Sequence, residues 1–96
     1  MITAGTNVKI VKGCKARNVA KNTTWHVREV QTMGAEYSHQ VRLVLTYGPR
    51  VLTFWARHAN RLSDPIVRMH DGSPSYTIEV KALAPGELGP GMIRVK

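Results

Sequence analysis

The chain has 96 residues, 43% of them hydrophobic and 21% charged, and 14 Lys and Arg against 6 Asp and Glu give it a formal net charge of +8. This length predicts one compact domain, and no apolar run approaches the ~20 residues that a membrane-spanning helix needs, so we expect no membrane association. The only cysteine, Cys14, excludes an internal disulfide and a cysteine-based zinc site. We therefore expect a cytoplasmic protein with one reduced thiol and no cofactor.

The cations are concentrated toward the N-terminus. Residues 1–28 contain six Lys and Arg and no acidic residue, since Glu29 is the first acid, and the sequence pI is about 10.3. A basic stripe without acidic partners is typical of a protein that binds a polyanion. The alternative is that these charges only keep a small protein soluble. The imbalance favours DNA or RNA as a partner.

The N-terminal third begins with a short strand and a basic loop. Residues 8–11 place Val8 and Ile10 on one face and a lysine on the other, which is the period of a half-buried strand. Residues 12–22, KGCKARNVAKN, combine four cations with glycine and asparagine and contain no acid. They predict a long, partly ordered loop, with a helix over 14–21 as the alternative.

The next strand, predicted over residues 23–33, has one irregularity. Trp25 and Val27 alternate as core residues, but Val30 is out of phase with them. A β-bulge near Arg28 and Glu29 would restore the pattern and bend the strand, as the wall of a small barrel requires. We therefore expect the indole of Trp25 to lie in the core.

Residues 40–56, QVRLVLTYGPRVLTFWA, predict a β-hairpin with a two-residue turn at Gly48 and Pro49. The register that this turn imposes opposes apolar residues on the core face, which are Val41 with Ala56, Leu43 with Phe54, and Leu45 with Leu52. The outer face opposes Arg42 with Trp55, Val44 with Thr53, and Thr46 with Val51, while Tyr47 faces Arg50. A slip of one residue would mix the two faces, so the register is tightly specified.

The segments after the hairpin are short. Residues 57–64 leave the strand pattern and predict one turn of 3-10 helix with Leu62 pointing inward. Strands are expected over residues 66–69 and 76–83, because the sequence HDGSPS between them is a strong turn signal.

Five to six short strands with one 3-10 turn indicate an all-β fold, and their order resembles an SH3-like barrel. We predict that this single domain covers residues 1–83. Residues 84–96 are rich in Pro and Gly and are predicted to be a tail or linker, in which residues 92–96 could add an edge strand.

The N-terminal segment, about residues 5–30, resembles the KOW-type module of ribosomal proteins and transcription elongation factors. That pattern has Gly and a polar residue before a V-x-I strand, then a basic loop with glycine, and the matching residues are Gly5, Val8, Ile10, Lys12, Gly13 and Lys15. The family has a second loop glycine before a valine strand, where this chain has Asn18-Val19 and Asn22 in a longer loop. The resemblance implies a nucleic-acid or ribonucleoprotein role.

Three groups of side chains are candidates for binding nucleic acid. They are the cations of the basic loop, the Arg42 and Trp55 pair, in which an exposed indole could stack a base beside a cation, and the cations around the 3-10 turn. The predicted nucleic-acid-binding residues are Lys12, Lys15, Arg17, Lys21, Arg28, Arg42, Arg50, Trp55, Arg57 and Arg61. For Trp55 the alternative is an indole half covered in a second small core.

The expected function is nucleic-acid binding that is driven by phosphate contacts and has low sequence specificity. The sequence contains no phosphate-loop, G-x-S-x-G or paired-carboxylate motif and no close histidine spacing, so we expect neither an enzyme nor a metal site. The alternative is an adaptor that docks on a protein partner in a transcription, translation or viral assembly, because small barrels of this kind host both roles.

Overall fold

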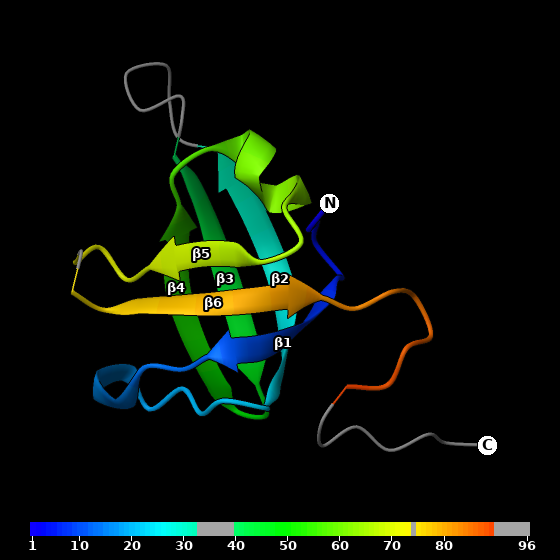
Figure 1. Cartoon of the computed structure of the whole chain (residues 1–96), viewed down its shortest axis with the longest axis horizontal. Helices are drawn as coiled ribbons and strands as arrows, with labels where there is room; N and C mark the ends of the chain where they lie inside the picture. Colours follow the sequence, from blue (N-terminus) through cyan, green and yellow to red (C-terminus); the bar gives the residue numbers. More distant parts are fainter. Residues whose placement is uncertain (33–39, 74, 90–96) are drawn as a thin grey trace.

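The structure is a computed structural model, and it describes residues 1–32, 40–73 and 75–89. Six antiparallel strands pair in sequence order and close into one barrel (Figure 1). The strands are β1 (Asn7–Lys12), β2 (Thr24–Thr32), β3 (Val41–Tyr47), β4 (Arg50–Ala56), β5 (Val67–His70) and β6 (Thr77–Ala82). The predicted fold class, a small all-β barrel, is confirmed.

Alternate residues of every strand fill the interior of the barrel. Val8 and Ile10 of β1 are fully buried, as the period of that strand predicted, and Phe54 of β4 is 1% exposed. The largest buried side chain is Trp25 of β2, also 1% exposed, so its predicted place in the core is confirmed. Because the interior is apolar, the charged side chains of the same strands lie on the outer surface.

The hairpin of β3 and β4 has the predicted register at every residue pair. Val41 opposes Ala56, Arg42 opposes Trp55, and the ladder continues to Tyr47 opposite Arg50. Gly48 has a φ of +57° at the first position of the two-residue turn, a conformation that glycine adopts without steric cost. The turn and the apolar pairs therefore specify the same alignment.

The predicted bulge in β2 is also present. The register between β2 and β3 shifts between Val27 and Glu29, so that Arg28 is the extra residue. After the shift, Val30 packs against the core although it is only partly buried. The bulge thus returns the apolar residues of a long strand to the inner face.

The basic loop is ordered by its own backbone. It contains a short 3-10 helix, η1 (Lys15–Arg17), and not the longer helix that was the alternative. Cys14 and Val19 bridge the loop as an antiparallel pair, and the amide of Cys14 donates to the carbonyl of Val19 at 2.9 Å. A Cβ on Gly13 would collide with that same carbonyl, so the loop needs glycine at this position.

A second 3-10 helix, η3 (Ala59–Ser63), joins β4 to β5 as predicted. Its residue Leu62 is buried, and the amide of Ile2 donates to the carbonyl of Leu62 at 3.0 Å. At the same end of the barrel, Leu83 follows β6 and its amide donates to the carbonyl of Asn7 at 2.9 Å. The edge strand predicted over residues 92–96 lies outside the described residues. None of the helices in the described ranges has the length and hydropathy needed to cross a membrane.

Candidate functional site

One row of outward-facing residues crosses the barrel from β2 to β6. The strand registers place Gln31 beside Arg42, Arg42 beside Trp55, Trp55 beside His70, and His70 beside Thr77. Each of these strands turns its neighbouring apolar residues into the core, so the row lies on the outer surface. The row puts the predicted Arg42 and Trp55 next to a histidine that the sequence analysis did not select.

Trp55 packs against His70 on this surface. The two ring centroids are 6.4 Å apart and the ring planes are inclined by 24°, an offset stacked arrangement. The amide of Gly72 donates to Nδ1 of His70 at 3.1 Å, so the neutral imidazole carries its proton on Nε2. Trp55 is half-buried, not enclosed, and its indole therefore keeps an exposed surface.

Arg42 flanks Trp55 on the other side. It is half-buried, and its guanidinium donates to Oε1 of Gln31 at 3.2 Å. Because Gln31 lies on β2, this hydrogen bond draws the guanidinium away from the indole on β4. Trp55 therefore has a cation on the adjacent strand whose guanidinium is hydrogen-bonded to β2.

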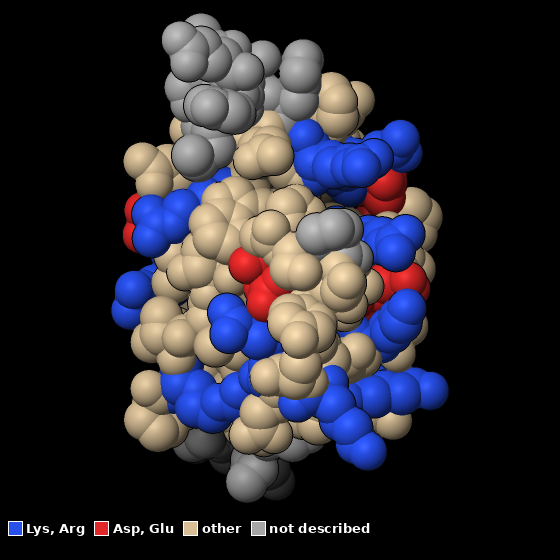
Figure 2. All heavy atoms as spheres, turned by 90° about the vertical axis from the view of Figure 1, so that its left-hand side faces the viewer, with Lys and Arg blue, Asp and Glu red and all other residues tan. Residues whose placement is uncertain are grey.

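The basic loop reaches the same side of the barrel through an ion pair. Nε of Arg17 lies 2.8 Å from Oδ2 of Asp71, whose side chain is only 5% exposed. Asp71 directly follows His70, so this contact ties η1 to the turn between β5 and β6 beside the ring pair. Figure 2 shows this side of the molecule, with Lys and Arg along the lower edge, where Figure 1 draws η1, and in a second group at the upper right.

Three further cations of the loop are exposed. Lys12, Lys15 and Lys21 form no ion pair with any residue in the described ranges. Lys12 ends β1 opposite Glu79 of β6, whereas Lys15 and Lys21 lie in the loop itself. The loop therefore presents positive charge to solvent, while Arg17 holds it against the barrel.

Arg50 has an intramolecular role. Its guanidinium donates to the carbonyls of Asn18 at 2.7 Å and Arg17 at 3.0 Å. The same group lies 5.0 Å from the ring centroid of Trp25, a cation–π distance. Arg50 therefore fastens the C-terminal end of η1 to the end of the barrel. It was predicted as a phosphate contact, and these hydrogen bonds use two of its five N–H donors.

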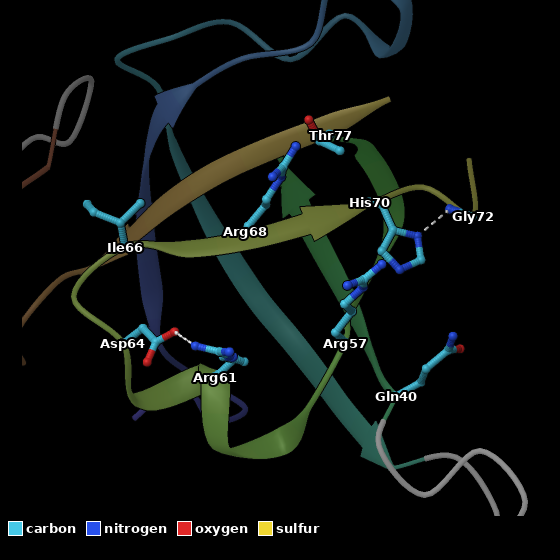
Figure 3. Close-up of a pocket in the computed structure, with 9 residues that line it drawn as sticks. All are labelled: Gln40, Arg57, Arg61, Asp64, Ile66, Arg68, His70, Gly72 and Thr77. Atoms are coloured by element: carbon cyan, nitrogen blue, oxygen red, sulfur yellow. Dashed lines mark hydrogen bonds and ion pairs between the residues drawn. The ribbon is translucent and has the colours of Figure 1, made fainter. Parts of the chain in front are cut away.

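A pocket of about 530 Å³ opens beside His70, between the end of β4, η3 and β5 (Figure 3). The residues around it are Gln40, Arg57, Arg61, Asp64, Ile66, Arg68, His70, Gly72 and Thr77. It forms because β4 and β5, within the described part of the chain, pair at Trp55 and His70 alone. Beyond that pair the chain leaves β4 for η3, and the two strands separate.

The pocket is positively charged. Three arginines surround it against one carboxylate, that of Asp64. Asp64 pairs with Arg61 at 3.6 Å, but both side chains are substantially exposed, at 39% and 66%, so the pair is weak. Arg57 and Arg68 form no ion pair with any of the residues that the structure describes.

The predicted residues thus lie in two regions that meet beside His70 and at one separate position. The two regions are the basic loop and the surface that runs from Arg42 and Trp55 to the pocket, and the separate position is Arg28. Arg57 and Arg61 belong to the pocket, whereas Arg28 is exposed at the bulge of β2. Arg68 and His70 were not predicted, although they belong to the pocket. Their signal is present in the sequence, because buried Val67 and Met69 alternate with them and turn both outward.

Within the described ranges, no group of three His, Cys, Asp or Glu side chains could hold a metal ion. Cys14 is half-buried and packs against the core. No known protein family, curated protein or solved structure matches the chain. The chemistry of the side chains around Trp55 is therefore what points to a function.

Proposed function

We propose that this barrel binds nucleic acid, mainly through the phosphate backbone and with low sequence specificity. One observation carries the proposal. The half-buried Trp55 stacks with His70, which lines a pocket together with three arginines, and the next residue, Asp71, holds Arg17 of the basic loop. Proteins that bind single strands use the same combination, in which cations follow the phosphates and an aromatic ring stacks a base.

The geometry favours a single strand over a duplex. A base can stack on Trp55 only when it is not stacked inside a helix, and each stacked base contributes ~1–3 kcal/mol. Lys and Arg contact phosphates of any sequence, and every base has a face that can stack. Binding of this kind is therefore strong in low salt and nearly independent of sequence.

The resemblance to KOW-type modules and to SH3-like barrels supports the same proposal. We infer an SH3-like arrangement from the order of elements, in which a basic loop separates the first two strands and a 3-10 turn joins β4 to β5. Gly13, one of the residues that carry the resemblance, lies where a Cβ would meet the carbonyl of Val19. Its glycine is thus required by the loop that presents the cations.

A titration across salt concentration tests the proposal. Fluorescence anisotropy of labelled single-stranded DNA and RNA should give a logarithm of the affinity that falls linearly with the logarithm of salt concentration, with a slope of about −0.7 for each phosphate contacted. An affinity that does not depend on salt, or no binding at low salt, would contradict the proposal.

A protein-docking role is the second candidate, and the seam between β4 and β5 favours it. These strands pair at a single position within the described residues, so much of the edge of β5 is available to an added strand. Exposed Ile66 lies at this edge, at 41%. A complex with a protein partner that survives nuclease treatment would favour this role.

A further inference from the structure

The residues that line the pocket beside His70 include more arginines than carboxylates. Arg57, Arg61 and Arg68 line the pocket together with the single lining carboxylate, that of Asp64, so the lining itself carries two net positive charges. Glu79, which opposes Arg68 across β5 and β6, lies outside the lining. A phosphodiester inside a strand carries one negative charge, whereas a phosphate monoester carries about −1.5 to −2 near pH 7. The charge of the pocket matches the monoester, which occurs only at the end of a strand.

The hydrogen-bond donors around the pocket suit the same group. Figure 3 shows Arg57 extending toward His70 and Arg68 extending toward Thr77, on either side of β5. Neither arginine has an ion-pair partner among the described residues. A single guanidinium can donate two parallel hydrogen bonds to the oxygens of one phosphate, and such charge-assisted hydrogen bonds are about twice as strong as neutral ones.

His70 connects the pocket to the stacking surface. Its Nδ1 accepts from the amide of Gly72, which leaves the Nε2 proton as the free donor of the neutral ring. The ring of His70 also stacks with that of Trp55, and the two ring centroids are 6.4 Å apart. A nucleotide whose phosphate entered the pocket would therefore have an aromatic surface within reach of its base.

The size of the pocket is sufficient for more than a phosphate ion. Its volume of about 530 Å³ falls within the ~300–1,000 Å³ that is usual for small-molecule sites. A terminal phosphate and its sugar fit in such a space.

From these observations we infer that the pocket formed by Arg57, Arg61, Arg68 and His70 binds the terminal phosphate monoester of a nucleic-acid strand. This inference rests on the proposed nucleic-acid binding and adds the part of the strand that the site recognises. In this arrangement Arg57 and Arg68 contact the terminal phosphate of the nucleic acid, and the basic loop contacts its internal phosphates.

Three oligonucleotides of one sequence test the inference with the full chain. One carries a 5′-phosphate, one a 3′-phosphate and one hydroxyl groups at both ends, and the fluorescent label is placed internally. We expect one phosphorylated end to bind at least about tenfold more tightly than the unphosphorylated strand. Equal affinities for all three strands would overturn the inference but leave the proposed function intact, whereas no binding of any strand would contradict the proposed function itself.

A pair of variants locates the effect. Arg57→Gln combined with Arg68→Gln should abolish the preference for the phosphorylated end and bring the ratio of affinities close to one. Lys81→Gln removes a charge from an exposed residue that does not line the pocket, so it should weaken all strands alike and preserve the ratio. If the preference survives in the double variant while circular dichroism shows a folded barrel, the end is recognised elsewhere and the assignment of the pocket is wrong.

Discussion

Among the residues that the structure describes, Trp55 and His70 are the one register pair that joins β4 to β5, and their rings stack at 6.4 Å between centroids. The same contact therefore completes the barrel wall and presents an aromatic surface to solvent. Gly72 supports it, because its amide donates to His70 and its Cα lies close to the indole, where a Cβ would be 3.8 Å from the ring. The candidate site is thus built on the closure of the barrel.

Replacing Trp55 tests the stacking surface. Trp55→Ala should weaken the binding of single-stranded nucleic acid by ~1–3 kcal/mol, because it removes the ring on which a base stacks. Trp55→Phe keeps a smaller ring and should lose less than half of that amount. Anisotropy titrations at one low salt concentration measure both, and near-ultraviolet circular dichroism checks the fold. Equal losses in the two variants would show that stacking does not contribute.

Arg42 and Lys81 allow a comparison of two single charges on one barrel. Arg42 lies beside Trp55 in the outward row, whereas Lys81 opposes Lys9 on the strands farther round the barrel. We expect Arg42→Ala to reduce the affinity for nucleic acid several-fold more than Lys81→Ala, because only the former is next to the stacking surface. The dissociation constants of the two variants decide this, and equal losses would mean that binding follows net charge alone.

Arg50 should matter more for stability than for binding. Arg50→Lys cannot reproduce the two hydrogen bonds to the carbonyls of Arg17 and Asn18, so we expect the free energy of unfolding to fall by ~1–2 kcal/mol. Arg28→Lys, at the exposed bulge of β2, should change it by less than ~0.5 kcal/mol. Urea denaturation followed by tryptophan fluorescence compares the two variants. Coincident unfolding curves for Arg50→Lys and Arg28→Lys would contradict the structural role of Arg50.

Asp71 restrains the basic loop, and its removal should affect stability and binding in opposite directions. Asp71→Asn breaks the ion pair with Arg17 but keeps an oxygen that can accept from the amide of Ser73. We expect the free energy of unfolding to fall by ~1 kcal/mol. The affinity for nucleic acid should rise several-fold, because Arg17 is released and the negative charge that neutralises it is removed.

Asp64→Asn is the matched control for the stability of the Asp71 variant. The pair between Asp64 and Arg61 is longer, at 3.6 Å, and more exposed, so its loss should change the free energy of unfolding by no more than a few tenths of a kcal/mol. Thermal unfolding and anisotropy give the two quantities for Asp71→Asn. A decrease in both stability and affinity would mean that the ion pair orders the loop for binding.

The sequence by itself determined the elements whose signals are local. The alternation of residues 41–56 and the Gly48-Pro49 turn specify the hairpin register, because a slip of one residue would expose the apolar face. The out-of-phase Val30 indicated the bulge of β2, and the departure from strand pattern after Ala56 indicated η3. Trp25 could be assigned to the core because it alternates with Val27 at the two-residue period of a strand.

The tertiary structure alone decided which cations act together and which are engaged within the chain. Arg17 meets Asp71 and Arg50 meets the carbonyl of Asn18 across 54 and 32 residues of sequence, respectively. No local pattern encodes such pairs, because they exist only once β5 has closed against β4 and the loop has folded onto the barrel end. The pocket has the same origin, since it forms where the ladder between those two strands stops, and that point is set by the closure of the whole sheet.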